Sequence, residues 1–159
     1  MSLFEKFDQS IPNNEKQISE YEAWIAILYA CLSSDGENSE SETDLLVNSI
    51  YTKEKFLGIQ ISPLYEKVMK IKNEIGQLKF LDMYCPVITE NERPTLFSLA
   101  VDLTFADGEL HREERNVIDM IAKRFQLNEE LASKIIEVMM IKNKGNILNK
   151  PLPLFTLIF

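Results

Sequence analysis

The sequence predicts an all-α protein, a compact bundle of about seven helices, and three observations support that prediction. Apolar residues recur at intervals of three and four along most of the chain. No stretch alternates apolar and polar residues for long enough to indicate a strand. A unit of about 70 residues is repeated, and each copy contains a helix-turn-helix pattern. With 159 residues and a hydrophobic fraction of 45%, the chain can bury a core without disulfides or structural metals.

In the first half of the chain, two apolar stripes mark helices. One stripe runs from Ile18 to Leu32. The other predicts one long helix from about Pro63 to Tyr84, capped by Ser62 and ended by Cys85-Pro86, because a residue before proline avoids helical angles. This helix passes through Gly76, a weak point that costs roughly 1 kcal/mol relative to alanine.

In the second half, three further stripes predict helices. They run from Leu96 to Leu103, from Val117 to Phe125 and from Leu131 to Val138, the last one opened by Asn128 as its cap. The methionine pair that follows, together with Ile141, favours core packing over a soft-metal site or a partner surface.

Charge and composition restrict the classes of partner and compartment. The chain carries 25 acidic and 17 basic residues, a net charge of -8, which argues against nucleic-acid binding and leaves a protein of unknown identity as the expected partner. No secretory signal is visible, and the longest apolar runs are far short of the roughly 20 residues that span a bilayer. Cys31 and Cys85 form no CxxC pair and are expected to be reduced, buried thiols. We therefore expect a cytoplasmic protein.

An internal repeat organises the chain as one domain over residues 1–159. Residues 23–50 align with residues 95–122 without a gap at an offset of 72, and both halves are acidic first and basic second. This register predicts half-repeats over about 15–85 and 86–145, related by a pseudo-twofold axis. Coincidence between two helix-turn-helix units is the alternative.

The repeat contains an Asp-Gly motif in each copy, DGENSESE at 35–42 and DGELHREE at 107–114. Each string matches the second half of a calcium loop, but Leu103 and Phe105 stand at the first and third ligand positions of the second copy and cannot bind calcium. One interpretation is a helix-to-helix corner used twice, with the glycine ending a helix. The other is that the corners meet and hold a divalent cation (calcium, magnesium or zinc), and the two are not exclusive. The predicted ligands are the carboxylates of Asp35, Glu42, Asp107 and Glu114.

The second copy carries a family resemblance. Leu99 to Leu110 forms a helix ending in Ala-Asp-Gly with a hydrophobic residue two positions later, and Glu114 closes the motif. This pattern resembles the TerB-like tellurite-resistance proteins and the N-terminal region of the DjlA co-chaperone, best over residues 95–143. The resemblance implies an all-helical, internally duplicated domain with clustered acids proposed to bind metal and a stress-response or interaction role. No J-domain His-Pro-Asp is present, so a co-chaperone ATPase role does not carry over.

Two functions follow from these observations, of which the first is favoured. One is a non-catalytic helical interaction module, linked to a divalent cation at the clustered acids. The alternative is a metal-assisted hydrolase that uses the acidic cluster. His111 is the single histidine and lies in a charged turn expected to be exposed, which counts against the hydrolase because such sites usually need histidine ligands.

The last ten residues, 150–159, form an apolar tail that contains two prolines. Six of its last eight residues are large and apolar, too many to leave in water. The tail must then lie in a groove, either on its own bundle as a clasp or on another chain. We expect the clasp, because packing in cis avoids the entropy cost of association.

Overall fold

The computed structural model describes residues 18–33, 40–108 and 110–146. In this part of the chain there are seven α-helices and three short 3-10 turns, and no strand, so the predicted all-α class and helix number are confirmed. The α-helices are α2 (Glu20–Leu32), α3 (Glu40–Tyr51), α4 (Ile61–Ile75), α5 (Gln77–Tyr84), α6 (Arg93–Thr104), α7 (Arg112–Arg124) and α8 (Glu129–Asn143). The 3-10 turns are η1 (Glu54–Phe56), η2 (Cys85–Val87) and η3 (Glu90–Glu92). Asp35 and the tail at 150–159 lie outside the described residues.

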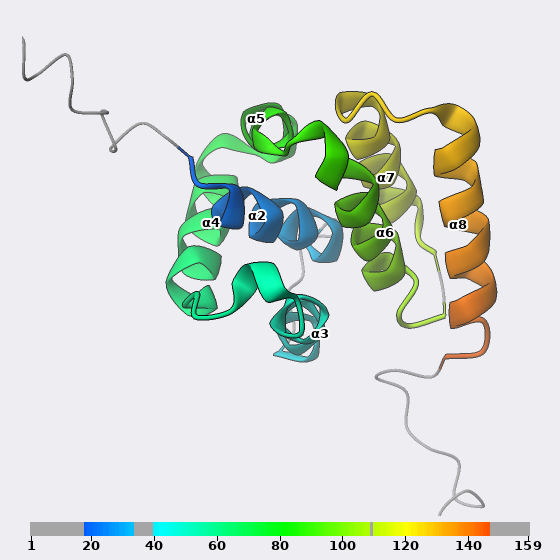
Figure 1. Ribbon diagram of the computed structural model, residues 1–159, viewed down its shortest axis with the longest axis horizontal. Coiled ribbons are helices and arrows are strands. Elements are labelled where there is room, and N and C mark those ends of the chain that lie inside the picture. Colours follow the sequence, from blue (N-terminus) through cyan, green and yellow to red (C-terminus); the bar gives the residue numbers. More distant parts are fainter. Residues whose placement is uncertain (1–17, 34–39, 109, 147–159) are drawn as a thin grey trace, which may run out of the picture.

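Helix α2 forms the centre of the bundle (Figure 1). It packs against α3, α4, α5, α6 and α7, and every residue from Glu22 to Leu32 is buried. Ser19 caps its start by accepting a hydrogen bond from the Glu22 backbone N–H at 3.1 Å. A helix that is apolar on all sides has to be surrounded by others, and its sequence, AWIAILYACL, has that character.

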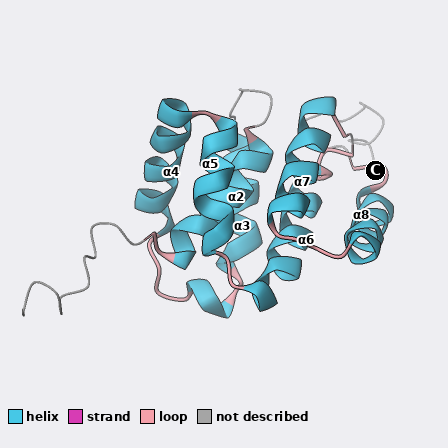
Figure 2. Cartoon of the chain, turned by 90° about the horizontal axis from the view of Figure 1, so that it is seen from above, coloured by secondary structure: helices cyan, strands magenta, loops and turns pink. Residues whose placement is uncertain are grey.

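The helices of the two halves recur at the register of the repeat. Helix α2 shifted by 72 residues covers almost the same positions as α6, and α3 shifted likewise covers almost the same positions as α7. Helices α4 and α8 lie at opposite ends of the molecule (Figure 2). The agreement in helix bounds fits a duplication, which itself stays a prediction.

The prediction of one long helix from Pro63 to Tyr84 is wrong, because the helix is interrupted at Gly76. This glycine has a φ of 81°, a left-handed angle that no continuing helix adopts. Its N–H closes α4 on the Lys72 carbonyl at 2.9 Å, and its own carbonyl accepts from Phe80 N–H at 3.0 Å to start α5. Ser62 lies inside the first turn of α4 rather than at the cap. The predicted end at Cys85-Pro86 is confirmed.

Helix α8 exists where predicted, and Asn128 caps it by accepting from Leu131 N–H at 3.2 Å. The core role expected for the methionine pair and Ile141 is confirmed for Met139, which is half-buried against the core, and is wrong for Met140 and Ile141. The exposed fraction is 53% for Met140 and 70% for Ile141, and Val138 is exposed as well. Helix α8 packs mainly against α6 at the edge of the bundle (Figure 1), so only part of its apolar surface has a neighbour.

Candidate functional site

The second Asp-Gly motif forms a tight corner between α6 and α7. Phe105 N–H bonds the Val101 carbonyl to end α6, and Gly108 N–H bonds the Phe105 carbonyl at 2.8 Å. Gly108 has a φ of 83°, which an L side chain rarely adopts. The left-handed angle expected for this glycine is confirmed, but α6 already ends at Thr104 with Phe105 as its cap, so Gly108 shapes the turn that follows rather than ending the helix. The corner presents Asp107 beside the start of α7.

The end of α8 is fastened to this corner. The Asn146 side-chain amide donates to the Ala106 carbonyl at 3.1 Å and to the Asn143 side-chain oxygen at 2.8 Å. A Cβ added to Gly108 would lie 2.7 Å from the Asn146 carbonyl oxygen, so glycine is also required for this close approach.

Three of the four predicted carboxylates line one small cavity of about 40 Å³. Glu42 comes from α3, Asp107 from the corner and Glu114 from α7. The fourth, Asp35, lies outside the described residues. The other lining residues are Cys31, Leu32, Leu45, Leu103, Thr104 and Ala106. Glu42 and Glu114 are partners at the repeat offset of 72, as are Cys31 and Leu103, so the cavity lies where equivalent parts of the two halves meet.

Local contacts fix the side chains around the corner. Glu114 accepts a hydrogen bond from His111 N–H at 3.0 Å, as part of a capping box that these two residues form at the start of α7. The His111 ring nitrogen lies 3.8 Å from an Asp107 oxygen, and the ring is exposed, as expected. Within the described ranges, no three His, Cys, Asp or Glu side chains are grouped closely enough to hold a metal. The cation site therefore stays a prediction.

Cys31 and Thr104 line the cavity without having been predicted as site residues. Burial raises the pKa of Cys31 to about 12, and the Glu114 charge acts in the same direction, so its thiol is neutral at pH 7. The Thr104 hydroxyl donates to the Ala100 carbonyl at 2.8 Å. A signal for Cys31 was present in the sequence, because it is the repeat partner of Leu103 four residues before the Asp-Gly motif.

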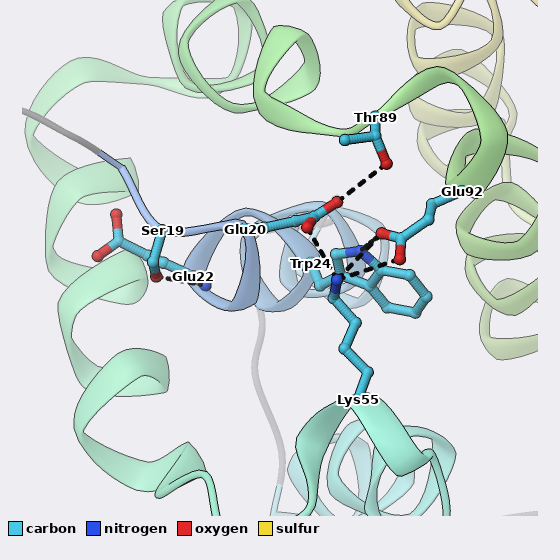
Figure 3. Close-up of polar contacts among 7 residues, drawn as sticks. All are labelled: Ser19, Glu20, Glu22, Trp24, Lys55, Thr89 and Glu92. Atoms are coloured by element: carbon cyan, nitrogen blue, oxygen red, sulfur yellow. Dashed lines mark hydrogen bonds and ion pairs between the residues drawn. The ribbon is translucent and has the colours of Figure 1, made fainter.

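A second polar cluster, which the sequence did not indicate, joins the two halves on another face (Figure 3). The Lys55 ammonium lies 2.9 Å from a Glu20 oxygen and 3.1 Å from a Glu92 oxygen, and Trp24 donates to Glu92 at 3.2 Å. The Glu92 contact and the Lys55 ammonium lower the pKa of Glu20 to about 2. Glu20 and Glu92 are also 72 residues apart, so a repeat-equivalent pair holds one lysine.

Glu22 is a buried charge between α2, α4 and α5. Its carboxylate accepts from the Tyr84 hydroxyl at 3.0 Å and pairs with the Lys67 ammonium at 2.7 Å. Burial, and next the negative Glu22, raise the pKa of the Tyr84 hydroxyl. These two partners explain how a carboxylate that is only 3% exposed remains acceptable in the core.

Comparison with known families decides the relationship. Residues 21–137 match the family described as tellurite resistance protein TerB. The chain belongs to the TerB family. The match runs from α2 through most of α8 and includes the small acidic cavity. Of the second polar cluster it includes Lys55 and Glu92, whereas Glu20 lies one residue before it. The resemblance inferred from the Ala-Asp-Gly motif is thereby confirmed.

No curated protein and no solved structure gives a significant match to this TerB chain. Among its described residues, none of the helices combines the length and apolar character that a membrane span requires.

Proposed function

We propose that this TerB chain is a non-catalytic helical interaction module that binds a divalent cation through Asp35, Glu42, Asp107 and Glu114. One observation carries the proposal: three of these carboxylates, from α3, the corner and α7, line a single cavity. The cation would link two helix-to-helix corners, so its binding would set how firmly the halves are joined. The module's partner is a protein, since the charge of -8 disfavours nucleic acid.

The chemistry of the cavity favours a hard cation. Carboxylate oxygens are preferred ligands of calcium and magnesium, whereas zinc is more often held by cysteine and histidine. His111 is exposed and does not line the cavity. Carboxylates brought close together repel one another, and a cation between them relieves that repulsion. We therefore expect calcium or magnesium to bind in preference to zinc.

The size of the cavity favours binding over hydrolysis. Its volume of about 40 Å³ suits an ion or a water molecule. Small-molecule sites are usually about 300–1,000 Å³. The hydrolase alternative would need room for a substrate beside the cation, and the cavity that the described residues enclose supplies little.

Thermal melts in chelator and in millimolar calcium, magnesium or zinc test the proposal. Bound cation stabilises the folded chain by about 2.7 kcal/mol at 100 times its dissociation constant, which raises Tm by roughly 5–10 °C. Glu114→Gln is expected to reduce that rise while leaving an oxygen to accept from His111 N–H. Asp107→Asn is expected to reduce it too.

Glu113→Gln is the matched control, because Glu113 is exposed in the same helical turn and does not line the cavity. It should keep the full cation-dependent rise in Tm. The cation site is wrong if wild type shows no rise with any of the three metals, or if Glu113→Gln and Glu114→Gln lose it equally.

A further inference from the structure

The outer face of α8 has apolar hollows that run along the helix. One hollow of about 370 Å³ lies at its C-terminal end, lined by Phe105, Met140 and Ile141 among others. A second, of about 380 Å³, shares Met140 and Ile141 and continues to Ile136 and Ser133. The two hollows therefore form one groove, which we call the α8 groove.

The lining of the α8 groove is mainly apolar, although it includes Glu137 and Lys144. Ile141 is 70% exposed and Met140 is 53% exposed, and they lie on consecutive positions at the point where the hollows join. Large apolar side chains at a helix surface are stabilised when another apolar segment excludes water from them. An apolar segment of polypeptide is therefore the expected occupant of the α8 groove.

The chain supplies such a segment at the end of the groove. The described residues end at Asn146, directly after Lys144 and Gly145, which line the first hollow. Residues 147–159 follow, and their only charged side chain is Lys150. The large apolar side chains near the end are Leu152, Leu154, Phe155, Leu157, Ile158 and Phe159.

Geometry allows this segment to reach the groove. Ser133 and Lys144 are separated by about 16 Å along a helix that rises 1.5 Å per residue. The stretch from Asn146 to Leu152 reaches about 20 Å when extended, and the residues after it extend further still. Pro151 and Pro153 disfavour a helix there and favour an extended backbone, which suits a groove along a helix surface.

We propose that residues 152–159 turn back along α8 and pack their apolar side chains into the α8 groove of the same chain. Tethering beside the groove gives the segment a high effective concentration, whereas a second copy must be recruited from solution. The charge of -8 on each chain also opposes self-association. The segment is thus an intramolecular clasp over α8, a helix that packs mainly against α6.

A double-mutant cycle tests the proposal in the full chain. Deleting residues 151–159 and substituting Ile141→Asp should each lower Tm by at least about 3 °C. In the deleted chain, Ile141→Asp should lower Tm by much less, because its apolar partner is already gone. Leu57→Asp is the matched control, since Leu57 is 84% exposed and follows η1 rather than lying on α8. Its small effect should be the same with and without the deletion. Additive effects of Ile141→Asp and the deletion would overturn the proposal.

Cross-linking keeps the proposal testable if the deleted chain aggregates. A photoreactive benzoylphenylalanine in place of Met140 should cross-link to residues 152–159 within a product of monomer mass. The same group in place of Leu57 should not. A product of twice the monomer mass would assign the groove to a second copy, and no cross-link to residues 152–159 would show that the segment lies elsewhere. Either outcome overturns the clasp.

Discussion

Helices α2 and α8 both carry large apolar side chains but lie in opposite environments. Both begin with acidic residues in the first turn. Helix α2 then continues with an unbroken apolar run from Ala23 to Leu32, whereas the apolar residues of α8 come in shorter groups, the longest from Val138 to Ile141. Helix α2 is buried from Glu22 to Leu32, whereas only Ala132 and Asn143 are buried in α8. The difference comes from neighbours, because α2 is packed by five helices and α8 mainly by α6. Apolar composition therefore made burial favourable in both helices, and the position in the bundle decided where it occurred.

The largest expected effect tests burial by the same substitution in both helices. Leu28→Ala in α2 removes a side chain that is 0% exposed, and should cost about 2–5 kcal/mol of unfolding free energy. Leu131→Ala in α8 removes a side chain that is 41% exposed, and should lower the unfolding free energy by no more than about 1 kcal/mol. Urea denaturation of both variants measures the contrast. Equal losses would mean that Leu131 is covered in solution.

A smaller effect is expected where α8 is fastened to the acidic corner. Gly108→Ala must adopt a left-handed angle and also place a Cβ 2.7 Å from the Asn146 carbonyl oxygen. Gly58→Ala has the same left-handed strain, with φ at 78°, but meets nothing within 4 Å. Strain alone costs about 1–2 kcal/mol. Gly108→Ala should therefore cost roughly 1–3 kcal/mol more than Gly58→Ala in the same denaturation measurement. Equal costs would show that Asn146 moves away freely.

The sequence predicted the positions of the helices better than it predicted which of their faces are buried. Apolar spacing located α2, α6, α7 and α8, because each turn of a helix returns to the same side. The spacing could not show that α8 lacks a neighbour at Ile141, since that depends on packing between distant segments. The apolar spacing also predicted a helix that continues through Gly76, whereas this glycine has a φ of 81° in the folded structure.

The candidate site could be predicted in part because the repeat marks equivalent positions. Glu42, Asp107 and Glu114 were named from the repeated motif, and they line one cavity. For Cys31 the only sequence signal is its repeat partner Leu103, and nothing local distinguishes a cavity-lining cysteine from one that is simply buried in the core. Lys55 lies about 35 residues after Glu20 and about 35 residues before Glu92 in the sequence. Ion pairs between residues so far apart in the chain leave no periodic pattern from which they could be predicted.

The smallest expected effect concerns the acidic first turns of α2 and α8, and it depends on pH. Glu20 pairs with Lys55 at 2.9 Å, and its pKa falls from an ordinary value of 4.5 to about 2 on folding. A group whose pKa is lowered on folding stabilises the folded state above its unfolded pKa, and that stabilisation is lost as pH falls toward the folded pKa. Glu20→Gln should therefore lower the unfolding free energy at pH 7, and its difference from wild type should shrink as pH falls from about 4.5 toward 2. Glu130→Gln is the control in α8, where Glu130 forms an exposed pair with Lys134 at 3.1 Å that contributes little. Denaturation curves at several pH values between 7 and 3 measure both variants. A Glu20→Gln deficit that stays constant over this range would show that the carboxylate acts through packing rather than through its charge.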